Sequence, residues 1–161
     1  MQNLSTCLWF EDCAEQAAAF YTGIFPNSRI LQTTHYLEGA LLDAGAVLTV
    51  RFSLDGTEYV ALNGGPNFSF TPAISLVAYC DDQEQLDDLW DKLCNDGHAG
   101  ECGWLTDRYG VAWQIVPRQL IALLTSPDRA AAQRAFSAMM QMTRLDIALL
   151  QEAYDGPRAA G

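Results

Sequence analysis

Basic side chains are scarce in this chain of 161 residues: 9 lysines and arginines stand against 20 aspartates and glutamates, which gives a formal net charge of −11. Proteins that bind nucleic acid use clusters of lysine and arginine to neutralise phosphates, and anionic membrane surfaces attract the same residues. The charge balance therefore argues against both partners. A solvated acidic surface that aids solubility is the simplest interpretation.

Histidines and paired cysteines are also in short supply. The chain has 2 histidines, His35 and His98, and 5 cysteines, none of which are spaced as C-x-x-C. An odd number of cysteines without that spacing argues against a disulfide framework and against a thiolate zinc site. We expect reduced, mostly buried thiols, and two histidines alone cannot supply a metal centre.

Long apolar runs are absent as well. No stretch approaches the roughly 20 residues of a membrane-spanning helix, and the first residues lack the basic-then-apolar pattern of a secretory signal. Half of the residues are hydrophobic, which is enough to bury a core, and the length is that of about one domain. We therefore expect a single soluble domain over residues 1–161, located in the cytoplasm.

The strongest local signal is a hairpin centred on Asp55-Gly56, a dipeptide typical of a two-residue type I′ turn. This turn fixes the register of the flanking runs, residues 47–54 and 57–62. The expected opposite pairs are Leu54 with Thr57, Phe52 with Tyr59, and Val50 with Ala61. These residues form an apolar face, and the other face carries Arg51 and Glu58 at diagonal positions.

The order of elements repeats once along the chain. LSTCLWF at 4–10 and ISLVAYC at 74–80 are strand-like runs 70 residues apart. Each run is followed by a segment with helical spacing of apolar residues, 14–23 and 83–95, and then by strand-like runs that end in a hairpin. The sequence therefore predicts two β-α-β-β(-β) modules.

The predicted boundaries follow from this repeat. We expect module one over residues 1–66, module two over 72–118, and C-terminal helices over 119–155. The intervening segment, NGGPNFSFTP, has the composition of a linker. Within the tail, helices are expected over about 118–124, 128–142 and 144–154, the second capped by Ser126 or Asp128.

Two such modules with CLWF, AEQAAAFYTGIFPNSRI, VALNGGP and CGWLTDRYGVAWQIVP resemble the PhnB-like family, often called 3-demethylubiquinone-9 3-methyltransferase-like. That family belongs to the vicinal-oxygen-chelate superfamily. The resemblance covers nearly all of residues 1–155. It implies an α+β fold of paired βαβββ modules around a cleft, the glyoxalase/bleomycin resistance/dioxygenase fold, followed here by a helical tail. It also implies a homodimer, commonly with exchanged elements.

In metal-using members of the superfamily, His, Gln or Glu occupies four cleft positions on the first and last strands of each module. Side-chain alternation and the resemblance place Ser5, Val60, Ser75 and Gln114 at these positions, with Thr6 replacing Ser5 if the alignment slips by one residue. Divalent ions bind through imidazole, thiolate or carboxylate groups. A glutamate at 114 would have been a metal ligand, whereas a glutamine beside two serines is not. We therefore expect no metal and no cofactor.

The candidates for ligand binding in the cleft are Ser5, Cys7, Trp9, Arg51, Glu58, Val60, Ser75, Tyr79, Trp104 and Gln114. Each has a simpler interpretation. Gln114 either orients a ligand or is a buried amide satisfied by backbone. The aromatic side chains either line a pocket or belong to the core. The Arg51–Glu58 pair either clamps an anion or is an exposed cross-strand pair, and Cys7 lacks a neighbouring base that would activate its thiol.

Three functions remain open. The favoured one is a metal-free protein that binds a small apolar or aromatic molecule. The second is a metal-dependent lyase, isomerase or dioxygenase of the same superfamily. The third is a methyltransferase, as the family label suggests, but the chain contains no G-x-G of the kind found in Rossmann-type cofactor loops. No complete catalytic set is identified, so catalytic residues stay unknown.

The predicted tail helices carry more apolar residues than two modules need. Phe136, Met139, Met140 and Leu149 are examples. We expect these helices to pack across a homodimer. The alternative is a helix pair that closes on its own subunit.

Overall fold

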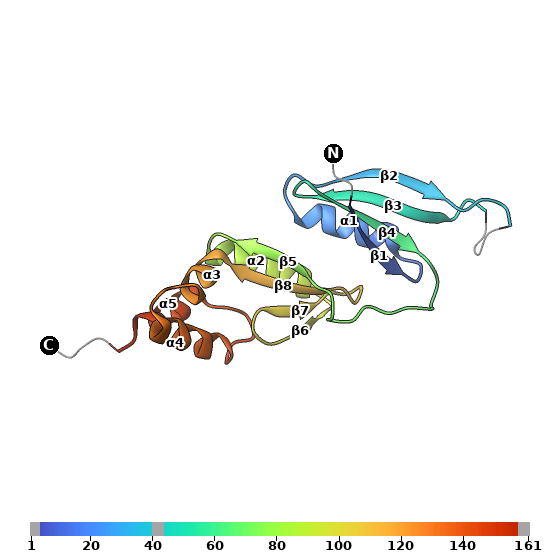
Figure 1. Ribbon diagram of the computed structural model, residues 1–161. Helices are drawn as coiled ribbons and strands as arrows, with labels where there is room; N and C mark the ends of the chain where they lie inside the picture. Colours follow the sequence, from blue (N-terminus) through green and yellow to red (C-terminus); the bar gives the residue numbers. More distant parts are fainter. Residues whose placement is uncertain (1–3, 40–43, 158–161) are drawn as a thin grey trace. The chain divides into compact units, whose positions relative to one another are not determined.

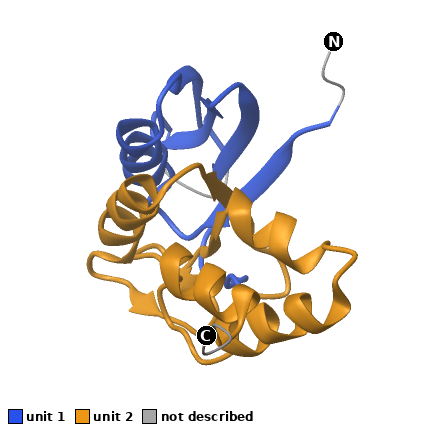
Figure 2. Ribbon diagram, turned by 90° about the vertical axis from the view of Figure 1, so that its left-hand side faces the viewer, with its two compact units in different colours: residues 1–70 blue, residues 71–161 orange. Residues whose placement is uncertain are grey.

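The computed structural model describes residues 4–39 and 44–157. It divides into two compact units, Met1–Phe70 and Thr71–Gly161, which Figure 2 colours separately. The boundary lies inside the predicted linker. Each unit contains a strand, a helix and three further strands, and the second unit continues into helices (Figure 1). This confirms the predicted pair of βαβββ modules with a helical tail.

Unit 1 is a four-stranded mixed sheet with one helix. Its elements are β1 (Thr6–Phe10), α1 (Ala14–Ile24), β2 (Arg29–His35), β3 (Val47–Leu54) and β4 (Thr57–Asn63). The strand order is β1-β4-β3-β2, with β1 parallel to β4 and the other neighbours antiparallel. The hairpin register agrees with the prediction at all three pairs: Val50 with Ala61, Phe52 with Tyr59, and Leu54 with Thr57.

The helix α1 covers one face of this sheet. Tyr21 of α1 stacks on Phe52 of β3 with a centroid distance of 6.2 Å. Val50 and Ala61 are fully buried beside them, so this face is the core that the alternation predicted. The opposite face is open within the unit, and its side chains are the candidates considered below.

Unit 2 repeats the arrangement with shorter outer strands. Its elements are β5 (Leu76–Cys80), α2 (Gln83–Cys94), β6 (His98–Ala99), β7 (Trp104–Thr106) and β8 (Ala112–Pro117). The order is β5-β8-β7-β6, with β5 parallel to β8. The β region predicted at 100–107 is therefore shorter than expected: it contains only β7, and β6 lies just before it. Leu105, Trp113 and Ile115 are buried with Leu86 of α2.

The tail consists of α3 (Arg118–Leu124), α4 (Arg129–Met139) and α5 (Ile147–Asp155), and Asp128 rather than Ser126 caps α4. The segment before α5 is fastened to α2 of the same unit. Gln83 donates to the Leu145 carbonyl (3.1 Å) and accepts from the Ile147 amide (2.9 Å). Arg144 bonds to two aspartates of α2. No helix among the described residues is long and apolar enough to cross a membrane.

Several predicted bounds are corrected at their ends. The first strand begins at Thr6 rather than at residue 4, and the equivalent strand of unit 2 begins at Leu76 rather than at 74. The last two helices are shorter than the apolar pattern suggests, because a turn over 140–146 interrupts them. Ser5 and Ser75 therefore lie just before their strands.

Candidate functional site

The open face of the unit 1 sheet is defined by its register. Val60 on β4 pairs with Cys7 on β1 and with Arg51 on β3, and Arg51 pairs with Gln32 on β2. The neighbouring row contains Trp9, Leu62, Thr49 and Thr34. Because directly paired side chains lie on the same face, these rows form one surface, which also carries Glu58.

The open face of the unit 2 sheet follows the same geometry. Gln114 on β8 pairs with Val77 on β5 and with Trp104 on β7. Tyr79 pairs with Val116 in the next row. Val77 and Tyr79 are 41% and 49% exposed, so the β5 side of the central amide presents an apolar and aromatic surface to solvent, while Trp104 on the other side is half-buried.

Gln114 is oriented by a serine. Its Nε2 donates to the Ser75 Oγ at 2.9 Å. This identifies the partner of the amide as a side chain of the same face rather than the backbone. Ser75 and Gln114, the residues at the two superfamily positions in unit 2, are therefore hydrogen-bonded to each other.

The other two positions, in unit 1, hold no comparable pair. Ser5 Oγ donates to the Glu58 carbonyl at 3.1 Å, and Val60 offers only a hydrocarbon side chain. None of the four side chains is a carboxylate, an imidazole or a thiolate, so the set does not fit a divalent metal ion. Among the described residues, no group of three or more His, Cys, Asp or Glu side chains could hold a metal ion.

Trp9 is fixed by the segment that follows β4. Its Nε1 donates to the Gly65 carbonyl at 2.9 Å, and Phe68 packs edge-on at 5.0 Å between centroids. A Cβ on Gly64 would lie 2.2 Å from the indole ring, so only glycine allows this approach. The two glycines of NGGP therefore let the chain pack closely against the Trp9 ring.

Arg51 and Glu58 form the expected cross-strand ion pair, with 2.8 Å between Nη2 and Oε2. Arg51 Nη1 also donates to Gln32 at 3.3 Å. Both charged side chains are more than a third exposed, and pairs of this kind contribute little to stability. The geometry agrees with the interpretation as an exposed pair and leaves the anion clamp without direct support.

Tyr79 has a cationic neighbour that the sequence analysis did not identify. The Arg118 guanidinium lies 5.1 Å from the centre of the Tyr79 ring and pairs with Asp81 at 3.0 Å. Arg118 begins α3, directly after the last strand. Tyr79 pairs with Val116, two residues before Arg118, and the side-chain rotamers then bring the guanidinium to the ring, so spacing along the sequence could not reveal the contact. Val77, by contrast, is the residue 70 positions after Cys7, and the repeat itself points to it.

Only Cys80 of the five cysteines is fully buried, so the expectation of mostly buried thiols is wrong. Burial raises the pKa of the Cys7 thiol, which keeps it protonated at neutral pH. Burial, with the charges of Asp81 and Asp82, raises the pKa of Cys80 to about 11. Because the thiolate is the nucleophile, neither residue is prepared for covalent catalysis.

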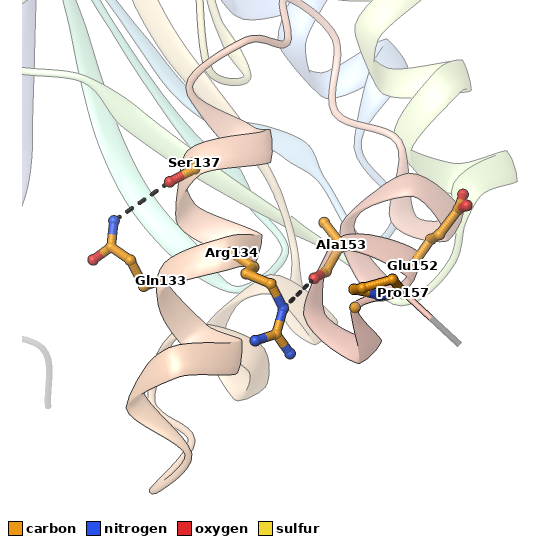
Figure 3. A pocket seen from close by; sticks show the side chains of 7 residues that line it. Gln133, Arg134, Ser137, Glu152, Ala153 and Pro157 are labelled. Carbon is orange, nitrogen blue, oxygen red and sulfur yellow. Dashed lines mark hydrogen bonds between the residues drawn. The ribbon is translucent and has the colours of Figure 1, made fainter. Parts of the chain in front are cut away.

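The candidate residues thus fall into two sets, one on each unit. Ser75, Tyr79, Trp104 and Gln114 share the open face of unit 2, and the remaining candidates share that of unit 1. A hollow of about 460 Å³ lies elsewhere, in the tail, lined by Gln133, Arg134, Ser137, Glu152, Ala153, Gly156 and Pro157 (Figure 3). Arg134 donates there to the Ala153 carbonyl at 3.0 Å. No candidate residue lines this hollow, and Arg134 serves to hold the end of α5.

Comparison with solved structures supports the fold. A PhnB protein from Bacillus cereus is 36% identical, with a TM-score of 0.67 over 72% of this chain and 99% of that chain. Protein PA1353 from Pseudomonas aeruginosa is 16% identical, with a TM-score of 0.60 over 73% and 98%. The fosfomycin resistance protein FosX from Mesorhizobium loti is 12% identical, with a TM-score of 0.51 over 72% and 91%. The last two show the shared fold alone.

No curated protein matches the chain. The family described as 3-demethylubiquinone-9 3-methyltransferase matches residues 2–116, and the helical tail lies beyond this match. The fold is that of the glyoxalase and bleomycin-resistance proteins. The chain therefore belongs to the PhnB-like, 3-demethylubiquinone-9 3-methyltransferase-like family.

Proposed function

We propose that this protein binds a small apolar or aromatic molecule on the open face of unit 2 without a metal ion. The observation that supports this most is the row Val77–Gln114–Trp104, with Tyr79 in the adjacent row. Hydrophobic and aromatic side chains around one oriented polar group are typical of small-molecule sites. The half-exposed Tyr79 offers a ring for stacking.

The residue types at the superfamily's four metal positions favour binding over chemistry. Lyase, isomerase or dioxygenase chemistry of this superfamily would need a metal at Ser5, Val60, Ser75 and Gln114, whose side chains do not suit one. Ser75 and Gln114 are moreover bonded to each other. The methyltransferase activity in the family name has no support from a glycine-rich cofactor loop.

The test is a thermal-shift and calorimetric titration with indole as the aromatic probe, repeated with EDTA and with added Ni²⁺ or Zn²⁺. We expect indole to raise the melting temperature equally with and without EDTA, and the ions alone to have no effect. Trp104→Ala should weaken indole binding, whereas Ile121→Ser should not. Ile121 is the control because it is an exposed apolar residue, at 42%, on α3 and outside the rows of that face. Stoichiometric ion binding would instead favour the metal-dependent enzyme.

We also propose that the protein is a homodimer that uses its tail. The support is a set of large apolar side chains on the tail helices that stay at least 42% exposed: Ile121, Phe136, Met140 and Leu149. Exposed apolar surface of this kind is typical of association sites. Sedimentation at micromolar concentration should give a dimer, and Phe136→Ser with Leu149→Ser should give a monomer. A monomeric wild-type chain would favour tail helices that serve only their own subunit.

The proposed cellular location is the cytoplasm. None of the 5 cysteines forms a disulfide, as is usual where glutathione and thioredoxin keep thiols reduced.

A further inference from the structure

The side-chain amide of Gln114, at the centre of the unit 2 face, has one atom that is available to bond to a ligand. Gln114 Nε2 is occupied by Ser75. Within the described residues, no donor lies at hydrogen-bond distance from Gln114 Oε1, yet this oxygen is not among the buried atoms that lack a partner. It is therefore accessible from the open face.

The surroundings of this oxygen make its hydrogen bond selective. Val77 and Trp104 flank Gln114 on the two neighbouring strands, and they would exclude water once a ring lies across the row. An acceptor covered without a partner costs more than a typical hydrogen bond gains. A ring that covers Gln114 is thus favoured if it brings a donor to Oε1.

We propose that the ligand class of this face is an aromatic ring that carries a hydrogen-bond donor, an N–H or O–H group, which donates to Gln114 Oε1. This inference rests on the proposed function and specifies its ligand. Ser75 is a positioning residue, because its Oγ holds the amide nitrogen and so turns the oxygen toward the ligand. Trp104 supplies the adjacent ring surface.

The experiment compares indole with benzofuran, a ring of similar shape in which an oxygen atom replaces the N–H group. Calorimetric affinities of the wild-type chain should favour indole by about twofold to tenfold, the usual net value of one neutral hydrogen bond. In Gln114→Leu, which keeps the side-chain size, benzofuran should still bind and the ratio of the two affinities should fall to about one.

The role of Ser75 has its own readout. Ser75→Ala should lower the indole-to-benzofuran ratio, and Ser75→Thr, which keeps the hydroxyl group, should restore it. Ser5→Ala should leave the ratio unchanged, because Ser5 is the equivalent serine of unit 1 and bonds to a backbone carbonyl there. A general loss of stability would lower the affinities for indole and benzofuran equally and leave their ratio unchanged. A change in the ratio therefore reports the orientation of the amide.

The outcomes are distinct. Equal affinities for indole and benzofuran in the wild-type chain would overturn this inference and leave the proposed function intact. A preference for quinoline, which has an acceptor nitrogen and no donor, would also overturn it, because the amide would then present its N–H. If none of the three rings binds, the proposed function fails and the inference fails with it.

Discussion

The two units use the same strand register but place different side chains at equivalent positions. Val60 lies between Cys7 and Arg51 in unit 1, and Gln114 lies between Val77 and Trp104 in unit 2. Arg51 is occupied by Glu58 and Gln32, whereas Trp104 adjoins an amide with a free oxygen. On the unit 1 face, the arginine is paired with side chains of the same face. The unit 2 face instead presents aromatic rings and a hydrogen-bond acceptor that is available to a ligand. The two units therefore share a backbone arrangement and differ in the chemistry of their open faces.

The units also differ in how they hold their hairpin turns, and this gives the largest expected effect. Asp55-Gly56 relies on backbone conformation, with φ of 44° and 82°. The turn of unit 2 relies on the buried carboxylate of Asp107, which accepts from Tyr109 N, Val111 N and Trp113 Nε1 at 2.8–3.0 Å. Asp107→Ala should lower the free energy of unfolding by about 2–4 kcal/mol, because it leaves these three donors without their acceptor.

Chemical denaturation measures this change. The control is Asp55→Asn, which tolerates the left-handed conformation and should change stability by less than about 0.5 kcal/mol. A loss below about 1 kcal/mol in Asp107→Ala would contradict the assigned role of the carboxylate.

The helix N-termini are a second difference. The α2 helix is capped by its own Asp82, whereas Cys13 gives α1 no side-chain cap. Asn63, at the end of β4, instead accepts from Ala14 N at 2.8 Å and donates to the Val47 carbonyl at 3.0 Å. Pro117 ends β8 at the equivalent position, paired with Cys80 as Asn63 is with Phe10.

Asn63→Ala should therefore cost about 1–3 kcal/mol, since it removes two bonds of a buried amide. Asp82→Ala should cost about 0.5–2 kcal/mol, the usual range for an N-cap. Thermal and denaturant unfolding of both variants tests the order. A larger loss in Asp82→Ala would show that α1 does not depend on its remote cap.

The Cys80 thiol should make unit 2 less stable at alkaline pH. Its pKa is about 11 in the folded chain, against an ordinary value of 9.0. Between these values the unfolded chain loses the proton and the folded chain keeps it, so the free energy of unfolding should fall as pH rises from 9 to 11. Cys80→Ala should show a shallower decline over that range. Parallel curves for the two proteins would mean that this thiol does not contribute.

The Arg51–Glu58 pair should give the smallest effect. Both side chains are well exposed, so Arg51→Gln should change stability by at most about 1 kcal/mol. It should leave indole affinity unaltered, because Arg51 belongs to the face of unit 1. A clear loss of indole binding in Arg51→Gln would contradict the distinction between the two faces. It would support a role for Arg51 in binding an anion or another ligand.

Sequence patterns were most informative where a short-range rule fixes long-range geometry. The Asp55-Gly56 turn predicts the hairpin register, and the 70-residue offset predicts the second module. Alternation also separated the open faces from the core. Patterns could not identify Asn63 as a cap or Asp107 as the support of a turn, because each side chain acts on backbone groups that only the folded chain brings near. The Arg118–Tyr79 contact and the Gln114–Ser75 bond depend on side-chain rotamers, which no spacing encodes.

The most direct test of the account is a crystal of the protein soaked with indole and Ni²⁺ together, with anomalous data collected for nickel. We predict electron density for the indole ring across Val77, Gln114 and Trp104, and no anomalous peak at Ser5, Val60, Ser75 or Gln114. A nickel peak among those four side chains, with indole absent from the unit 2 face, would contradict the account and point to metal-dependent chemistry.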